Sequence, residues 1–155
     1  MRVLLGVLTV GILLFVGGPG YVRAADDTLV TVSSSYDFDT TLERLTAAIA
    51  KRGLKQFAVI DHASGAEDVG VDLRPTTLVV FGHPKVGAPV MAQAQTTGLD
   101  LPLKILVTQG DDGAVSLIYR QPRALVAGHG LDPVPPQITA MTKGLEAITS
   151  EASAE

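Results

Sequence analysis

The stretch LKILVTQGDDGAVSLIYRQ, residues 103–121, consists of two alternating segments on either side of a short polar loop. Alternation with a period of two places one set of side chains on one face of a β-strand. The residues that share a face are Leu103, Ile105 and Val107 in the first segment and Val115, Leu117 and Tyr119 in the second. The loop Gly110-Asp111-Asp112-Gly113 supplies the residue types that a tight reversal needs. This stretch therefore predicts an antiparallel β-hairpin.

Outward from the hairpin, short apolar segments alternate with segments of helical spacing. The further predicted strands are residues 29–34, 55–62 and 76–81. The predicted helices lie within residues 36–53, 64–71, 88–95, 122–127 and 135–150. A hairpin combined with helices between other strands favours an α+β fold: a single domain with a mixed or antiparallel sheet and its helices on one face.

Local signals set the expected ends of three helices. Thr40 followed by Glu43 is typical of a capping box, and Gly53 supplies a stop for the same helix. Ser64 is the expected cap of the short helix that follows, and Pro89 suits the first turn of the helix over 88–95. The last residues, 150–155, are expected to be a frayed, solvated end.

The first 24 residues have the pattern of a secretory signal peptide. Arg2 precedes an uncharged apolar run, and Val22-Arg23-Ala24 provides a site for cleavage. An uncleaved anchor is the alternative, although the run is shorter than the roughly 20 residues of a membrane-spanning helix. We therefore expect a signal peptide over residues 1–24 and one domain over 25–155, with a core over 29–131. The expected location is periplasmic or secreted.

Composition excludes several classes of function. The chain has no cysteine, which rules out disulfides, thiolate metal sites and thiol catalysis. Removing residues 1–24 takes away Arg2 and Arg23 and no acid, so the formal net charge changes from -4 to -6. An acidic chain with scattered basic residues has no general attraction for phosphate backbones or anionic lipid. We expect no nucleic-acid partner, and no membrane partner after cleavage.

Several short sequence motifs of residues 59–131 occur in the same order in a known family. They are "IDHA", "RPT", "FGHPKVGAPVM", "GLDLPLK" and "HGL". The stretch resembles the bacterial domain of unknown function family 302. The resemblance implies an α+β domain similar in layout to the TATA-binding-protein fold, and it implies no reaction. Two residues depart from the family pattern: His83 stands where asparagine is usual, and Ala88 where threonine is usual.

The strand-to-helix turn over residues 82–89 is the first candidate site. Its glycines, Gly82 and Gly87, have Walker A spacing, but Ala88-Pro89 replaces the lysine and hydroxyl residue that bind nucleotide phosphates. A weaker form of the idea survives, in which helix-start amides, His83 and Lys85, with His62 nearby, hold a carboxylate, a small oxyanion or a protein partner. The alternative is a structural turn with a solvated Lys85.

The three histidines form the second candidate site. His62 and His83 follow apolar strands, and His129 follows a short helix. If all three converge, with Asp61 beside them, they make a transition-metal site; a single imidazole with Met91 makes a haem ligand pair instead. A hydrogen-bonded structural role for each histidine is the alternative. The identity of any cofactor stays unknown.

Two further expectations concern catalysis and assembly. Asp61, His62 and Ser64 suggest a nucleophile system only on paper, because neighbouring strand residues point to opposite faces. No complete catalytic set is visible, so the sequence favours binding over an enzyme without excluding one. The stretch "GLDLPLK", residues 98–104, presents Leu99, Leu101 and Leu103 on one face, which the C-terminal helix or a second copy in a homodimer would cover.

Overall fold

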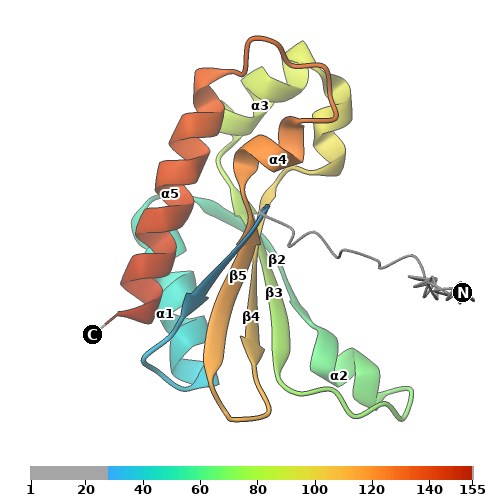
Figure 1. Ribbon diagram of the computed structural model, residues 1–155, viewed down its shortest axis with the longest axis vertical. Coiled ribbons are helices and arrows are strands. Elements are labelled where there is room, and N and C mark those ends of the chain that lie inside the picture. Colours follow the sequence, from blue (N-terminus) through green and yellow to red (C-terminus); the bar gives the residue numbers. More distant parts are fainter. Residues whose placement is uncertain (1–27, 155) are drawn as a thin grey trace, which may run out of the picture.

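The hairpin of residues 103–121 lies at the centre of a five-stranded antiparallel sheet (Figure 1). The computed structural model describes residues 28–154, so the signal peptide expected over residues 1–24 lies outside them. The strands are β1 Leu29–Ser33, β2 Lys55–Asp61, β3 Thr76–Gly82, β4 Leu103–Gln109 and β5 Val115–Arg120. Their order in the sheet is β1-β5-β4-β3-β2, and every neighbouring pair is antiparallel. The predicted α+β class is confirmed, with an antiparallel rather than a mixed sheet.

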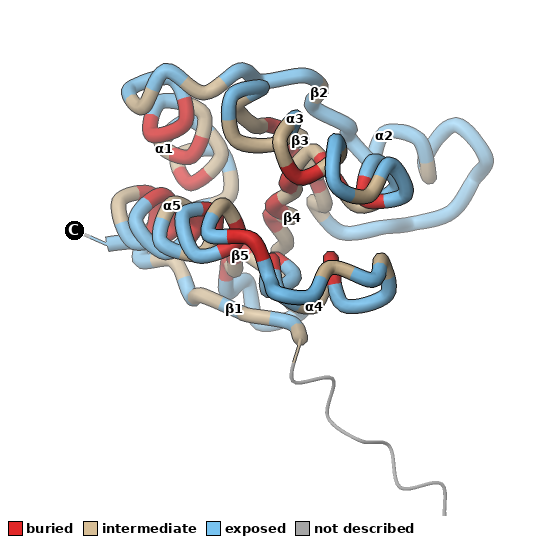
Figure 2. Tube along the Cα trace, turned by 90° about the horizontal axis from the view of Figure 1, so that it is seen from above, coloured by how far each residue is buried: buried red, intermediate tan, exposed pale blue. Residues whose placement is uncertain are grey.

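The helices connect and cover these strands. They are α1 Phe38–Lys51, α2 His62–Glu67, α3 Pro84–Gln93, α4 Pro122–Val126 and α5 Pro136–Ser153, and a 3-10 helix, η1, covers Gln95–Leu99. The long helices α1 and α5 lie side by side against one face of the sheet (Figures 1 and 2). Within residues 28–154, no helix combines the length and apolar character needed to cross a bilayer.

The hydrophobic core lies between the sheet and the helix pair α1 and α5, where Figure 2 shows buried segments of both layers facing one another. The alternating residues predicted for the hairpin all point into it. Ile105, Val107 and Leu117 are fully buried, and Leu45 of α1 and Leu145 of α5 meet them from the helix layer. We call this the covered face of the sheet. The opposite face, which we call the open face, carries half-buried apolar residues such as Leu106 and Ile118.

Helix α1 begins earlier than the sequence predicts. Asp37 is the N-cap, and its side chain accepts a hydrogen bond from the backbone N–H of Thr40 at 2.8 Å. The predicted capping box at Thr40 and Glu43 is therefore wrong, because an aspartate three residues upstream fills the same role. The predicted stop is confirmed: Gly53 has φ of 65°, a left-handed conformation that favours glycine.

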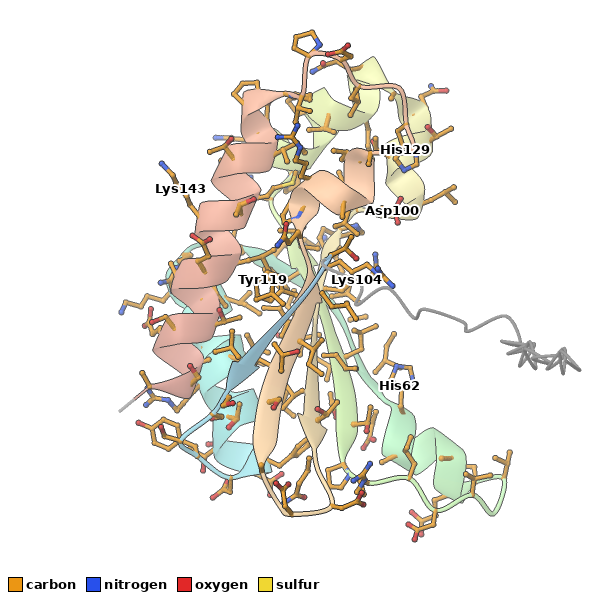
Figure 3. All side chains as sticks on the ribbon, in the orientation of Figure 1. His62, Asp100, Lys104, Tyr119, His129 and Lys143 are labelled. Carbon is orange, nitrogen blue, oxygen red and sulfur yellow. The ribbon has the colours of Figure 1, made fainter. Side chains whose placement is uncertain are left out.

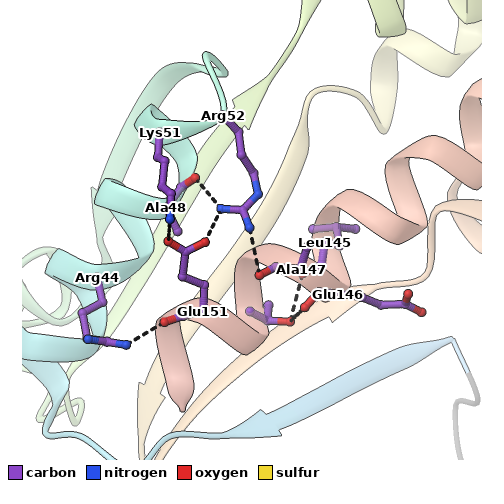
Figure 4. A network of polar contacts seen from close by, with 9 residues as sticks. Arg44, Ala48, Lys51, Arg52, Leu145, Glu146, Ala147 and Glu151 are labelled. Atoms are coloured by element: carbon purple, nitrogen blue, oxygen red, sulfur yellow. Dashed lines mark hydrogen bonds and ion pairs between the residues drawn. The ribbon is translucent and has the colours of Figure 1, made fainter. Parts of the chain in front are cut away.

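A polar seam joins the exposed edges of α1 and α5 (Figure 4). Glu151 accepts from Lys51 at 2.8 Å and pairs with Arg52 at 2.7 Å. Arg44 donates to the backbone carbonyl of Glu151 at 2.8 Å. The hydrogen bonds from Lys51 and Arg52 hold the pKa of the Glu151 carboxyl below its ordinary value. The seam fixes how the two helices lie beside each other above the core.

Helix α5 continues past the predicted end at residue 150. It runs to Ser153, and Ala152 is fully buried. The backbone N–H of Ser35 donates to the carbonyl of Ser153 at 2.9 Å, and the Tyr36 hydroxyl donates to the carbonyl of Ala154 at 3.2 Å. The predicted frayed end is therefore wrong up to Ala154, because the segment after β1 supplies hydrogen bonds that the sequence pattern alone does not reveal.

Helices α2 and α3 also begin before their predicted starts. Asp61, not Ser64, is the N-cap of α2, since its side chain accepts from the backbone N–H of Ser64 at 3.0 Å. Helix α3 starts at Pro84 rather than at residue 88, which places Pro89 inside the helix and not in its first turn. Asp61 is the last residue of β2 and His83 directly follows β3, so almost no loop separates either strand from its helix.

Candidate functional site

The pairing of β4 with β5 stops before either strand does. It runs from Gln109 opposite Val115 to Leu106 opposite Ile118. Beyond that point β4 stays paired with β3 as far as Leu103, and β5 stays paired with β1 as far as Arg120. At this end of the sheet a cavity of about 330 Å³ opens, which we call the sheet-face cavity. Its volume lies at the lower end of the range of about 300 to 1,000 Å³ typical of small-molecule sites.

Most of the lining of the sheet-face cavity is apolar. Leu78 of β3, Leu106 of β4 and Ile118 of β5 line it from the sheet. Leu29 of β1 and Leu125 of α4 line it as well. Such a lining favours a ligand with a hydrocarbon body, because water gains little from occupying an apolar cavity.

Lys104 is the half-buried cation of this cavity (Figure 3). Its Nζ donates to the backbone carbonyl of Asp100 at 2.8 Å and to that of Pro102 at 3.1 Å. Burial lowers the pKa of the Lys104 ammonium, and the negative charge of Asp100 acts in the opposite direction. The two carbonyls therefore hold the amine at a fixed point in the cavity wall.

Arg120 brings a second positive charge to the same cavity from the end of β5. One of its guanidinium nitrogens, Nη1, donates to the hydroxyl of Thr28 at 2.9 Å. Lys104 and Arg120 thus reach the cavity from β4 and β5, beyond the last residue pair that joins the two strands.

Asp100, which lines the cavity, and His129 form a partly buried pair (Figure 3). His129 Nε2 lies 2.7 Å from Asp100 Oδ2, and His129 Nδ1 lies 2.9 Å from the hydroxyl of Thr96. The His129 side chain is only 11% exposed. With both ring nitrogens engaged, His129 ties the segment after α4 to the segment around η1. This bond orients the Asp100 carboxylate, which itself lines the sheet-face cavity.

The turn over residues 82–89 has a different chemistry from the one its sequence suggests. His83 is the N-cap of α3, and its Nδ1 accepts from the backbone N–H of Lys85 at 3.1 Å. The N–H groups of Val86 and Gly87 donate to the His83 carbonyl, and Pro84 has no N–H. The backbone amides of residues 84–87 are thus used within the chain, and Lys85 is exposed. They offer no amide cradle to an anion.

A second, smaller cavity lies beside this turn. It measures about 260 Å³ and is lined by Gly82, His83, Gly87 and the side chains of Phe57 and Met91, among others. Its lining is almost entirely apolar. Three of the residues predicted for a ligand site at the turn therefore do share one cavity, but without the fourth, Lys85, among its lining residues. Anion binding at this turn stays a prediction that the cavity's apolar lining does not favour.

The three histidines occupy separate places in the fold. His62 is the exposed first residue of α2, His83 caps α3, and His129 pairs with Asp100. Figure 3 shows His129 in the upper part of the molecule and His62 well below it, at the start of α2. Among residues 28–154 no group of three or more histidine or acidic side chains is arranged to hold a metal ion. The predicted convergence on one metal is therefore wrong. A haem ligand pair of a single imidazole with Met91 stays a prediction.

Comparison with known proteins assigns the family. The model of the family described as "Domain of unknown function DUF302" matches residues 30–151. The chain belongs to this family. The fold agrees with the crystal structure of an uncharacterized conserved DUF302 protein from Bacillus stearothermophilus, with a TM-score of 0.75 at 21% identity. That match covers 81% of this chain and 98% of the other. The resemblance seen in the sequence is confirmed.

Curated relatives of this DUF302 domain carry the names of membrane proteins. The chain is 34% identical over 138 residues to proteins named fluoride-specific ion channel FluC 1 in Brucella suis and FluC 2 in Brucella melitensis. Each match covers 88% of this chain, but only 54% of the first relative and 51% of the second. The chain therefore spans about half the length of the curated relatives it matches.

Sequence reasoning missed Lys104 and Arg120 of this DUF302 domain. Both occupy positions of the hairpin strands that alternate with core residues, where a basic side chain normally faces solvent. Lys104 lies in the same stretch, "GLDLPLK", whose leucines are expected to be covered by the C-terminal helix or by a second copy. Leu101 and Leu103 are buried in the chain's own core, while Leu99 is 82% exposed. The one available signal was a lysine flanked by apolar residues on both sides.

Proposed function

We propose that this chain is an exported DUF302 domain that binds a small organic anion with an apolar body in the sheet-face cavity. The observation that carries the proposal is the half-buried Lys104, anchored in the wall of an apolar cavity that Arg120 also lines. The proposal keeps the carboxylate ligand expected from the sequence. It places that ligand in the sheet-face cavity instead of at the turn over residues 82–89.

The polar end of the ligand is expected at Lys104. An ammonium group has three donors, and two of them go to the carbonyls of Asp100 and Pro102. The third can donate to a ligand carboxylate, and hydrogen bonds to charged groups contribute about 1.5 to 3 kcal/mol. A bound anion also offsets the cost of holding the ammonium group partly out of water. Arg120 adds long-range attraction for the same carboxylate.

The apolar end of the ligand is expected over Leu106 and Ile118. Each methylene buried there contributes about 0.8 kcal/mol. Affinity should therefore rise from acetate to butanoate to hexanoate, until the cavity of about 330 Å³ is filled. A strongly hydrated inorganic anion gains nothing from such a lining, so the proposal favours carboxylates with a hydrocarbon chain over fluoride.

A titration followed by amide chemical shifts tests the proposal. Acetate, hexanoate and sodium fluoride are added separately to the wild type, to Lys104→Met and to Lys85→Met. We expect hexanoate to shift resonances of β4 and β5, and to bind Lys104→Met about tenfold or more weakly. Lys85→Met removes an exposed lysine at the turn and is the matched control. Equal affinity in the two variants, or shifts confined to residues 82–89, would refute binding at Lys104.

A second candidate function rests on the relatives' names. A domain that matches half of a protein named as a fluoride-specific ion channel is a candidate accessory of such a channel. The measurement is growth of the host in sodium fluoride after deletion of the gene for this chain. Increased sensitivity, restored by the gene, would support this role; unchanged sensitivity would contradict it.

Export and assembly are parts of the proposal with their own measurements. Mass analysis of the protein made in its host should find Ala25 as the first residue, because residues 1–24 have the pattern of a cleaved signal peptide. A chain that keeps Met1 or Arg2 would contradict cleavage. The predicted homodimer is checked by light scattering of the purified protein, where a single monomer mass at high concentration would contradict it.

A further inference from the structure

Lys104 differs from a lysine that only neutralises a ligand. Its Nζ is held by two backbone carbonyls, those of Asp100 and Pro102, both in the segment that leads directly into β4. The neutral form of an amine has two N–H donors and one lone pair. Two carbonyl acceptors match those two donors and leave the lone pair for a further partner. Lys104 lines the sheet-face cavity, so a molecule bound there would lie within reach of that lone pair.

We propose that Lys104 forms a reversible imine with the carbonyl carbon of a small 2-oxo carboxylic acid held in the sheet-face cavity. This inference rests on the anion-binding function proposed above and names the class of anion. In a 2-oxo acid the carbonyl carbon is bonded directly to the carboxylate. Arg120 attracts the carboxylate, Lys104 meets the adjacent carbonyl, and the aliphatic chain lies over Leu106 and Ile118.

The environment of Lys104 supports a nucleophilic amine. Burial lowers the pKa of its ammonium group, so more of the neutral amine is present than for a lysine in water. Lysines desolvated in apolar pockets are the ones that proteins use for Schiff bases. The negative charge of Asp100 opposes this shift, and a ligand carboxylate adds to that opposition.

The step needs no oxidant or second reactant. The lone pair of Lys104 attacks the carbonyl carbon, and the C=O π electrons move to the carbonyl oxygen. A proton passes from nitrogen to that oxygen and gives a carbinolamine. The hydroxyl of the carbinolamine takes up a second proton and leaves as water while the C=N bond forms, and the iminium nitrogen then returns one proton to the group that supplied it. Amine and ketone thus become imine and water. Asp100, which lines the same cavity and is oriented by His129, is the described carboxylate placed to exchange protons.

Reductive trapping tests this inference on the full chain. The protein is incubated with 2-oxohexanoate and sodium cyanoborohydride, and the adducts are located by peptide mass mapping. Reduction of the imine adds the mass of the acid plus two hydrogens minus one water. We expect about tenfold more adduct at Lys104 than at Lys85 or Lys143, because those two lysines line neither described cavity. Hexanoate, which has no ketone, should compete and lower the yield at Lys104.

Two controls separate this inference from the proposed function. Lys104→Arg has no amine that forms this imine, so it should give no adduct at position 104, whereas Lys143→Arg, a change of an exposed lysine outside both cavities, should leave the adduct yield at Lys104 unchanged. Chemical shifts that show 2-oxohexanoate bound at β4 and β5 without an adduct would overturn the imine and leave anion binding intact. Absence of binding by both acids would overturn both. Adducts spread evenly over the lysines and unaffected by hexanoate would also overturn the imine.

Discussion

Ile105 and Leu106 are neighbours on β4, yet they serve opposite faces of the sheet. Ile105 is fully buried in the core with α1 and α5, and Leu106 is half-buried in the lining of the sheet-face cavity. On the covered face each apolar side chain meets another, so its contribution is to stability. On the open face the apolar side chains line a space beside Lys104 and Arg120. The same alternation therefore builds the core on one side and the candidate site on the other.

The largest expected effect is a difference in unfolding free energy between a variant of the covered face and a variant of the open face. Ile105→Ala leaves a void in the core and should lower the free energy of unfolding by about 2 to 5 kcal/mol. Leu106→Ala removes a similar volume from the cavity wall and should cost less than about 2 kcal/mol, because the site is already partly open to solvent. Urea denaturation of both variants measures the difference. Equal losses would show that the open face is packed as tightly as the covered one.

The next effect concerns ligand affinity at the open face. Leu125 reaches the sheet-face cavity from α4, and Leu125→Ala should weaken hexanoate binding by about fivefold to thirtyfold through lost apolar contact. Acetate is too short to reach along the cavity, so its affinity should stay the same. Isothermal titration with both acids measures the contrast. A parallel loss for acetate and hexanoate would mean that Leu125 acts on the fold rather than on the ligand's hydrocarbon chain.

The covered face could be predicted from the sequence because its buried residues follow a regular pattern. The period of two in residues 103–121 gave the hairpin and its buried residues, and helical spacing identified α1 and α5. Helix ends were less predictable. Asp37, Asp61 and His83 each cap the helix that follows, and such caps depend on one side chain whose direction a pattern does not reveal.

The candidate site could not be predicted from the sequence because it lies where the regular pairing of β4 with β5 stops. The cavity depends on the end of pairing between β4 and β5 after Leu106 and Ile118, and nothing in either strand's composition marks that point. The turn at residues 82–89 was conspicuous for its glycines and prolines. Pro84 is explained by a helix start directly after β3, with His83 as its cap, and Gly87 and Pro89 lie within that helix. Conspicuous turn chemistry and ligand chemistry therefore lie at different places in this fold.

A moderate effect is expected at the start of the helix layer. Asp37→Ala removes the side-chain acceptor for the Thr40 N–H at the N-terminus of α1. Loss of one N-cap should lower the melting temperature by a few degrees. Hexanoate affinity should not change, because α1 lies on the covered face. Glu43→Ala, which changes an exposed residue of the same helix and leaves the Asp37 cap intact, is the control for thermal melting; an equal loss in that variant would indicate that the cap is not the cause.

The smallest effect concerns the seam that joins α1 to α5. Lys51 and Arg52 lower the pKa of the Glu151 carboxyl, so the folded state binds that proton less readily than the unfolded chain does. This contribution to stability is present above the unfolded pKa of about 4.3 and is lost as the pH falls through the lower, folded value. Because the Lys51 side chain is 72% exposed, solvent and salt screen the pair, and the effect on the melting temperature should be slight.

Melting curves of the wild type and Glu151→Gln between about pH 7 and pH 3 measure this contribution. The wild type should melt slightly higher at neutral pH, and the two curves should converge in acid, since a protonated glutamate resembles glutamine in charge. Added salt should reduce the difference in melting temperature at neutral pH, because it screens the ion pairs of Glu151. A difference in melting temperature that stays the same at every pH would mean that Glu151 stabilises the helix pair by packing. The charges of the seam would then contribute nothing to stability.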